Sequence, residues 1–306
     1  MNTPFTPLVA AGKVCFREIM KKFASTLSSW VGIILVAAFL VGCSSVPVTG
    51  RKQLRLVSAG EEAKLGLTSF DQMKKETPIS RDPTANAMVQ RVGQRLAAIA
   101  GKDLPNAQWE FVVFDSPEAN AFCLPGGKVG VYKGLLPIAR DEAGLATVLG
   151  HEIAHAAAHH GAERMSEQMV LQTGGQAVGA LTSSDPRMQG LATTAFGLGG
   201  QLGRTLPHSR KQETEADHIG LIYMAQAGFN PQAAVDFWQR FSAYNQQKGG
   251  GNSVWFLSTH PVDSARIAAL QKEMQEAMSF YRPGGAVGGT GTGSVTIPSG
   301  VISRPR

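Results

Sequence analysis

The sequence predicts an α+β domain that is mainly helical, with a small β-sheet lying over one central helix. Three observations predict this fold class. Apolar residues recur at helical spacing over several long segments. Two short segments rich in Val, Phe and Tyr are separated by turn residues, as strands are. The hydrophobic content of 43% over 306 residues is ordinary for a globular protein that buries its own core.

The N-terminal half of the domain contains two predicted helices followed by two predicted strands. Helical periodicity covers residues 58–75 and 83–100. The period then changes in "WEFVVFD" (109–115) and "KVGVYKG" (128–134), which read as strands. The segment between them, "SPEANAFCLPGG", is rich in turn residues and predicts a loop.

The C-terminal half is predicted to be helical. A long helix opens at Asp141 and carries the histidine-rich run "GHEIAHAAAHHG" (150–161). A second helix covers residues 212–227 and is closed by Gly228. Asn230 is predicted to cap a third helix, and a last helix covers about residues 262–281.

Two segments rich in glycine lie outside this pattern. Residues 173–203 are rich in Gly, Ala and Thr and nearly uncharged, which indicates either a lid or a plain linker. Residues 283–306 read as a disordered Gly-rich tail. The folded domain is therefore predicted to span residues 58–282.

The first 42 residues have the pattern of a signal peptide, with a basic start and a short apolar core, residues 30–41. They end in "LVGC", which resembles the lipobox of bacterial lipoproteins. The resemblance implies that Cys43 is lipidated, that residues 43–57 form a tether to the membrane, and that Ser44 directs the protein to the periplasmic side of the outer membrane. The alternative is a signal anchor in which the cysteine is incidental.

The charge argues against a nucleic-acid-binding protein, and the cysteine content argues against a protein stabilised by internal disulfides. The net charge is +6, but Lys13, Arg17, Lys21 and Lys22 against Glu18 leave only about +3 for the rest of the chain, so nucleic acid is not an expected partner. Beyond Cys43 the chain contains only Cys123, so an internal disulfide is not expected.

The pattern H-E-x-x-H in the histidine-rich run predicts a metal site. His151 and His155 are four residues apart, so on a helix both face the same ion, while Glu152 is turned toward a water molecule. His155 and His159 have the same spacing, but Ala156 stands where the glutamate would be. The first pair is therefore the better candidate.

A catalytic zinc ion usually has three protein ligands. A third histidine ten positions after His151 is excluded, because that position is Gly161. The best remaining donor lies in "SRKQETEADHIG" (209–220), where Glu213 and Asp217 share one helical face. This spacing lets Glu213 bind the metal while Asp217 accepts a hydrogen bond from a ligating imidazole. Glu215 is expected to point elsewhere.

These motifs together resemble the zinc metallopeptidases of the HtpX and CAAX prenyl-protease type, peptidase family M48. The resemblance includes H-E-I-A-H, then S-R-x-x-E-x-E-A-D, and it extends to "NAFCLPGGKVGVYKGLL" (120–136) and "STHPVDSARI" (258–267). "VTGRKQLRLVS" (48–58) is similar to the small outer-membrane lipoprotein members. The likeness covers roughly residues 48–275.

The resemblance implies a gluzincin-like fold that binds one zinc ion per chain. By position, His151, His155 and Glu213 would be the ligands, Glu152 the general base and Asp217 the partner of a ligating histidine. His260 would lie near the zinc and either keep the protease latent or assist catalysis. The alternative is a structural histidine at the entry of the last helix, held by Pro261. The other histidines of the run, His159 and His160, are expected to be structural or to face solvent, and His208 and His218 are expected to have no direct role.

The resemblance also leads to an expectation about substrates. The strand at residues 128–132 would bind an extended chain by strand addition. The residues assigned to this binding are Asn120, Gly126, Gly127, Val129 and Val131. The predicted function is a periplasm-facing metalloendopeptidase that cleaves misfolded or unassembled envelope proteins. The alternative is a chaperone-like assembly factor whose zinc site is plugged. The sequence does not indicate an oligomeric state.

Overall fold

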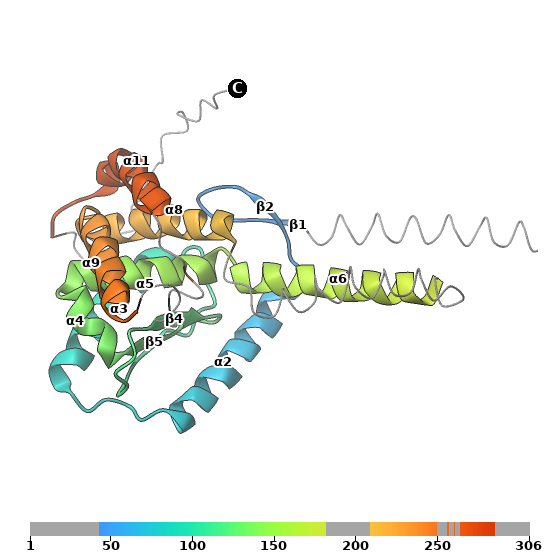
Figure 1. The fold of residues 1–306 in the computed structure, drawn as a ribbon, viewed down its shortest axis with the longest axis horizontal. Coiled ribbons are helices and arrows are strands. Elements are labelled where there is room, and N and C mark those ends of the chain that lie inside the picture. Colours follow the sequence, from blue (N-terminus) through green and yellow to red (C-terminus); the bar gives the residue numbers. More distant parts are fainter. Residues whose placement is uncertain (1–42, 182–208, 250–255, 257–259, 261–263, 285–306) are drawn as a thin grey trace, which may run out of the picture. The chain divides into compact units, whose positions relative to one another are not determined.

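The computed structural model describes residues 43–181, 209–249, 256, 260 and 264–284 (Figure 1). The chain divides into two compact units. One unit comprises residues 1–61 and 161–205, and the other comprises residues 62–160 and 206–306. The second unit contains every residue predicted to bind metal or substrate. The predicted signal peptide lies outside the described residues, as does the predicted tail from residue 285 onward.

Helices α2 (Ala59–Glu76) and α3 (Pro83–Ala100) have nearly the predicted bounds. Asp82 caps α3, because its carboxylate accepts hydrogen bonds from the backbone nitrogens of Thr84 and Ala85. Pro83 follows at the first helical position, where its missing N–H costs nothing. α3 turns one apolar face inward, formed by Ala85, Val89, Val92, Leu96 and Ala100.

A three-stranded sheet follows, formed by β3 (Glu110–Phe114), β4 (Ala121–Leu124) and β5 (Lys128–Tyr132). The strand order is β3-β5-β4, with β3 parallel and β4 antiparallel to β5. β4 lies in the segment predicted to be a loop, because its turn residues flank a strand of only four residues. The sheet lies against helix α5, as predicted, and β4 is the strand that contacts it (Figure 1).

The strand order changes the predicted mode of substrate binding. β5 is paired on both sides, so no further strand can be added to it. The side chains of Val129 and Val131 are fully buried, which also excludes direct contact with a substrate. The prediction of strand addition to β5 is therefore wrong. Within the described sheet, β4 is an edge strand.

The rest of the second unit is helical. Its helices are α4 (Leu136–Ala139), α5 (Glu142–Ala157), α8 (Arg210–Gln226), α9 (Ala233–Gln247) and α11 (Ser264–Phe280). α5 packs along α8, and α8 also packs against α11 (Figure 1). Gly228 follows the end of α8 with φ +79°, the left-handed conformation predicted for it. The helix predicted to be capped by Asn230 begins later, at Ala233.

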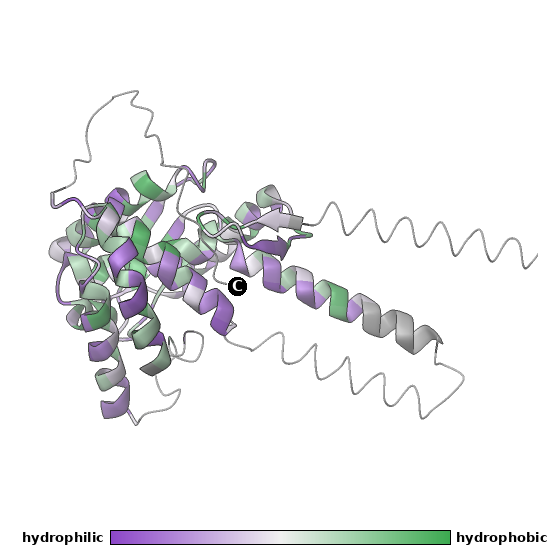
Figure 2. Ribbon diagram, turned by 90° about the horizontal axis from the view of Figure 1, so that it is seen from above, coloured by the Kyte–Doolittle hydropathy of each residue, from purple (hydrophilic) through white to green (hydrophobic). Residues whose placement is uncertain are grey.

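Helices α3 and α9 are amphipathic, and Figure 2 shows hydrophilic and hydrophobic bands side by side on the helices. In α9 the aromatic residues Phe237, Trp238 and Phe241 are buried, whereas Asp236 is exposed. The ring of Phe256 joins this cluster, with its centroid 5.4 Å from that of Phe241. This aromatic core lies beside the predicted metal site, since the ring centroids of Trp238 and His151 are 5.7 Å apart.

The first unit contains the hairpin of β1 (Cys43–Ser45) and β2 (Lys52–Leu54) and helix α6 (His160–Leu181). Arg51 forms a two-pronged ion pair with the buried Glu163, with N–O distances of 2.5 and 2.8 Å. α6 carries one hydrophobic turn among hydrophilic ones, and Met169, Val170 and Leu171 are exposed there (Figure 2). The predicted lid is helical up to Leu181, and residues 182–208 lie outside the described residues. None of the described helices is long and apolar enough to cross a bilayer.

Candidate metal centre

Helix α5 positions three of the predicted residues on its buried side. The Asp141 carboxylate caps the helix by accepting a hydrogen bond from the Gly144 nitrogen at 2.8 Å. Further along, His151, Glu152 and His155 are 1%, 4% and 6% exposed. Polar groups buried to this degree need partners, and the structure supplies most of them from α8.

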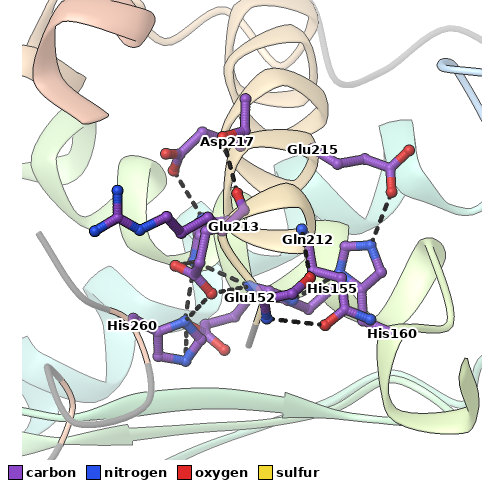
Figure 3. A network of polar contacts seen from close by, with 12 residues as sticks. Glu152, His155, His160, Gln212, Glu213, Glu215, Asp217 and His260 are labelled. Carbon is purple, nitrogen blue, oxygen red and sulfur yellow. Dashed lines mark hydrogen bonds and ion pairs between the residues drawn. The ribbon is translucent and has the colours of Figure 1, made fainter. Parts of the chain in front are cut away.

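Helix α8 begins with a capping box, in which Ser209 and Gln212 bond to each other's backbone nitrogens. The cap fixes the first turn, which contains Glu213. Glu213 is 4% exposed and is turned toward the two histidines of α5. Its carboxylate oxygens lie 3.5 Å from Nε2 of His151 and 3.3 Å from Nε2 of His155 (Figure 3).

His260 completes a compact group of four donor atoms. Nδ1 of His260 lies 3.0 Å from a carboxylate oxygen of Glu213 and 3.3 Å from Nε2 of His151. The Nε2 atoms of His151 and His155 are 3.1 Å apart. Ligands at 2.0–2.1 Å from a tetrahedral zinc ion are separated by about 3.3 Å. The group His151, His155, Glu213 and His260 therefore has the chemistry and the spacing of a zinc site.

The carboxylate of Glu213 is suited to bind a cation. Burial raises its pKa, but hydrogen bonds from His151, His155 and His260 have the larger combined effect and hold the pKa far below its ordinary value. The group is thus ionised at neutral pH. An ionised carboxylate between two imidazole nitrogens is a typical donor set for a catalytic zinc ion.

Glu152 has the surroundings expected of a general base. Its Oε1 atom is buried and has no hydrogen-bond partner among the described residues. The Nε2 atom of His260 lies 3.6 Å from this oxygen. Burial raises the pKa of Glu152 above its ordinary value, although the nearby histidines oppose this shift. An unpartnered carboxylate oxygen here can accept a hydrogen bond from a water molecule or a substrate.

Asp217 lies behind His151, as its spacing from Glu213 predicted. Its Oδ1 atom is 2.9 Å from Nδ1 of His151, on the opposite side of the ring from the donor group. Arg266 on α11 was missed as a site residue, although it belongs to the quoted motif "STHPVDSARI". It bonds both oxygens of Asp217 at 2.7 and 2.8 Å and lies 2.9 Å from Glu213. Its guanidinium also stacks on Trp238, 4.0 Å from the ring centroid.

His160 and Glu215 lie behind the donor group and are not part of it. His160 is fully buried, and it lies 2.8 Å from His155 and 3.1 Å from Glu215 (Figure 3). Of the two expectations for His160, the structural one agrees with this position, and Glu215 contacts His160 and not the donor atoms, as expected. The sequence concealed this contact because the predicted long helix ends at Ala157 and the chain turns at His159.

Two of the residues assigned to substrate binding have structural roles instead. Gly126 and Gly127 form the turn between β4 and β5, with φ of +84° and +81°. Their carbonyl oxygens accept hydrogen bonds from the backbone nitrogens of Gln108 and Glu110. Asn120 is 4% exposed, and its Oδ1 atom has no hydrogen-bond partner in the described part of the chain. Of this predicted set, Asn120 alone has an unpaired polar side-chain atom.

Comparison with known proteins identifies the family of this chain and several of its relatives. The sequence pattern of "Peptidase family M48" matches residues 83–274. The "Mitochondrial metalloendopeptidase OMA1" of Schizosaccharomyces pombe is 36% identical over 76% of this chain and 66% of its own length. The protein of the same name from Saccharomyces cerevisiae is 32% identical over 80% of this chain and 75% of its own length. The "Beta-barrel assembly-enhancing protease" of Escherichia coli K12 is 28% identical, and the match spans 83% of this chain and 52% of that protein.

The comparisons contradict the predicted localisation. Several of the similar proteins are named as mitochondrial metalloendopeptidases, from fission yeast and budding yeast to human. The assignment to the periplasmic side of the outer membrane, attached through a lipid on Cys43, is therefore wrong. The prediction depended on a short N-terminal pattern, whereas the similarity to the mitochondrial proteins extends over most of the chain.

The predicted enzyme class and cofactor are confirmed at the level of the family. Peptidases of this family use zinc, and the related proteins are named metalloendopeptidases. The four-residue donor group lies within the matched segment. The matched segment also contains α5 and α8, the two helices that position the donors. On both sequence and geometry, this chain belongs to peptidase family M48.

Proposed function

We propose that this protein is a zinc-dependent endopeptidase that cleaves extended segments of unfolded or misassembled polypeptides. The observation that carries the proposal is the buried Glu152 carboxylate, which has an unpartnered oxygen beside a donor group of zinc spacing. A protein that only bound zinc for stability would not need a carboxylate in this position. His151, His155 and Glu213 would hold the ion.

The chemistry is divided between the ion and Glu152. When bound, zinc polarises the scissile carbonyl and makes a water molecule more acidic. Glu152 removes the proton from the attacking water and returns it to the leaving amine. Burial raises the pKa of Glu152 above its ordinary value, which makes the carboxylate a stronger base. The products are two peptides, with no covalent intermediate on the protein.

Edge strand β4 is the proposed binding site for the substrate backbone. It is unpaired on one side within the described sheet, and it contacts α5, which carries Glu152. An extended peptide added to β4 would be held mainly by main-chain hydrogen bonds, with little demand on sequence.

The names of the relatives support this substrate class. One relative is named as a protease that enhances β-barrel assembly, and others are named as mitochondrial metalloendopeptidases. Backbone recognition at β4 requires an extended chain, which unfolded or misassembled proteins expose.

Digestion of casein tests the proposal, since casein is largely unfolded. The zinc-loaded protein is expected to degrade it, and Glu152→Gln is expected to lose about 10²–10⁴-fold in rate. Zinc content measured on the same samples should be equal, because Glu152 is not part of the donor group. Equal degradation by the two proteins would refute the assignment.

The position of His260 favours a second candidate, a chaperone-like protein that binds clients and cleaves rarely. Its Nδ1 atom fills the fourth position of the donor group, which a catalytic zinc site normally leaves open to water. If His260 keeps the site latent, His260→Ala should digest casein faster than the unchanged protein. A slower variant would instead indicate that His260 assists catalysis. The chaperone reading also requires Glu152→Gln to suppress aggregation of an unfolded client.

A further inference from the structure

We propose that His160 and Glu215 form a hydrogen-bond relay that fixes the orientation and the tautomer of His155 as a metal ligand. They are positioning residues, because neither belongs to the group of donor atoms. The inference rests on the proposed function in one respect, namely that zinc is bound by His155.

The two ring nitrogens of His155 have different partners. Nε2 belongs to the donor group and lies 3.3 Å from Glu213. Nδ1 lies 2.8 Å from Nδ1 of His160, and Nε2 of His160 lies 3.1 Å from an oxygen of Glu215. The three side chains form a line that leads from the donor group to a buried carboxylate (Figure 3).

This line allows one arrangement of protons when His155 binds a metal. A ligating imidazole is neutral, so if Nε2 binds the ion then Nδ1 carries the hydrogen. That hydrogen is donated to Nδ1 of His160, which must therefore be an acceptor. Nε2 of His160 then carries its own hydrogen and donates it to the carboxylate of Glu215. The carboxylate thus defines both tautomers.

The side chains of the relay are buried. His155, His160 and Glu215 are 6%, 0% and 7% exposed, so water has little access to their polar atoms. A buried imidazole N–H or carboxylate without a partner is destabilised, because it loses its hydration and gains nothing in return. The two hydrogen bonds of the relay give these buried groups partners in the arrangement described above.

The backbone provides an independent sign that His160 is placed for this contact. On an uninterrupted helix, a residue five positions after His155 would point about 140° away from it around the axis. Instead α5 ends at Ala157, and His159 adopts φ +54°, which is uncommon for a residue other than glycine. Nδ1 of His159 lies 2.7 Å from the buried Glu62, which holds this turn. The turn lets His160 point back toward His155.

The relay has a counterpart on the other ligating histidine. Nδ1 of His151 meets Asp217 directly, whereas Nδ1 of His155 meets Glu215 through His160. Both carboxylates lie on α8, two and four residues after Glu213. This helix therefore supplies one ligand and supports both of the others. Groups that accept a hydrogen bond from the non-ligating nitrogen of a metal-binding histidine usually contribute strongly to metal affinity.

The test compares the zinc affinity of three relay variants with a matched control. Zinc affinity is measured by competition with a chelator of known affinity, and the unfolding temperature of each zinc-free protein is measured in parallel. His160→Leu removes both hydrogen bonds and should weaken zinc binding by about 10–100-fold. His160→Asn keeps an acceptor, Oδ1, at the place of Nδ1, so it should recover part of that loss. Glu215→Gln removes the charge at the end of the relay and should weaken binding severalfold.

His218→Gln is the control, because it removes another histidine, on α8, and its contact with a carboxylate, that of Glu273. His218 belongs neither to the relay nor to the donor group. The control should bind zinc as the unchanged protein does, even if its zinc-free form unfolds at a lower temperature.

The proposal and the proposed function fail in different ways. If the unchanged protein binds zinc and His160→Leu binds it equally well, the relay is refuted while the zinc site stands. The relay is also refuted if His160→Asn and Glu215→Gln bind zinc as tightly as the unchanged protein. This second comparison can be made even if His160→Leu does not fold. If the unchanged protein binds no zinc, the proposed function itself fails.

Discussion

Gly150 on α5 and Gly220 on α8 lie against each other, so that the two helices touch through their backbones. A Cβ atom added to Gly220 would lie 2.9 Å from the His151 nitrogen and 3.0 Å from the Gly150 carbonyl carbon. A Cβ atom added to Gly150 would lie 3.0 Å from the Gly220 oxygen. Larger residues here would push the helices apart, and the side chains of α8 would move away from the histidines of α5.

We expect Gly220→Ala to destabilise the fold and to weaken the zinc site. The new methyl group clashes with backbone atoms, which cannot rotate away, so a loss of about 1–3 kcal/mol in the free energy of unfolding is expected. Urea denaturation and zinc titration measure the two effects. Gly161→Ala is the control: a Cβ atom there meets nothing within 4 Å, and alanine in a helix should stabilise by roughly 0.5–1 kcal/mol. Equal stability of the Gly220 variant and the unchanged protein would contradict the proposed contact.

Glu213→Gln should abolish most zinc binding. The amide lacks the negative charge that lies between the nitrogens of His151 and His155. We expect the loss in zinc affinity to exceed roughly 10–100-fold, which is typical when a residue that hydrogen-bonds to a metal ligand is substituted. Zinc should also cease to raise the unfolding temperature, because stabilisation by a ligand depends on its affinity. Metal analysis after gel filtration provides the check, with Glu152→Gln as the control that retains zinc. Full zinc occupancy in Glu213→Gln would exclude this residue as a ligand.

Arg266→Gln should be one of the most destabilising single changes in the second unit. The guanidinium neutralises the buried carboxylates of Asp217 and Glu213, and removing one partner of a buried ion pair costs about 3–5 kcal/mol. Arg91 offers a contrast, because its ion pair with Glu142 is largely exposed and should contribute less than about 1 kcal/mol. Denaturant unfolding of the two glutamine variants measures the difference. Similar losses for both would mean that Arg266 does not hold the carboxylates.

The stability provided by His218 should depend on pH. Its Nδ1 atom lies 3.6 Å from Glu273 on α11, and this contact raises the pKa of His218, although partial burial opposes the shift. A raised folded-state pKa means that the stabilisation is fully present below the unfolded value of about 6.5 and is lost as the pH rises through the folded value. His218→Gln should therefore lower the free energy of unfolding more at pH 6 than at pH 9.

Chemical denaturation of the zinc-free proteins at both pH values measures this difference. The other ionisable groups are common to both proteins, so their contribution largely cancels in the comparison. A loss that is independent of pH would show that His218 is not held in its charged form by Glu273.

Several features of the chain follow from sequence alone because their causes are local. Capping by Asp82 and Pro83 fixes the start of α3, and the observed helix has the predicted bounds. The spacing of His151 and His155 on α5 predicts that both face one point, and the four-residue spacing of Glu213 and Asp217 predicts a shared face on α8. In each case, residues within about one turn of the same helix determine the feature that was predicted.

Other features depend on contacts between segments far apart in the chain, and only the tertiary structure decided them. Strand order places β5 in the centre of the sheet and β4 at its edge, which moves the proposed substrate strand from the predicted position. The turn at His159 brings His160 behind His155, and α11 brings Arg266 to Asp217 and Glu213. The physical reason is that a side chain has no metal, base or partner until another element packs within a few ångströms of it. For α5 and α8, the contact of Gly150 with Gly220 sets that distance.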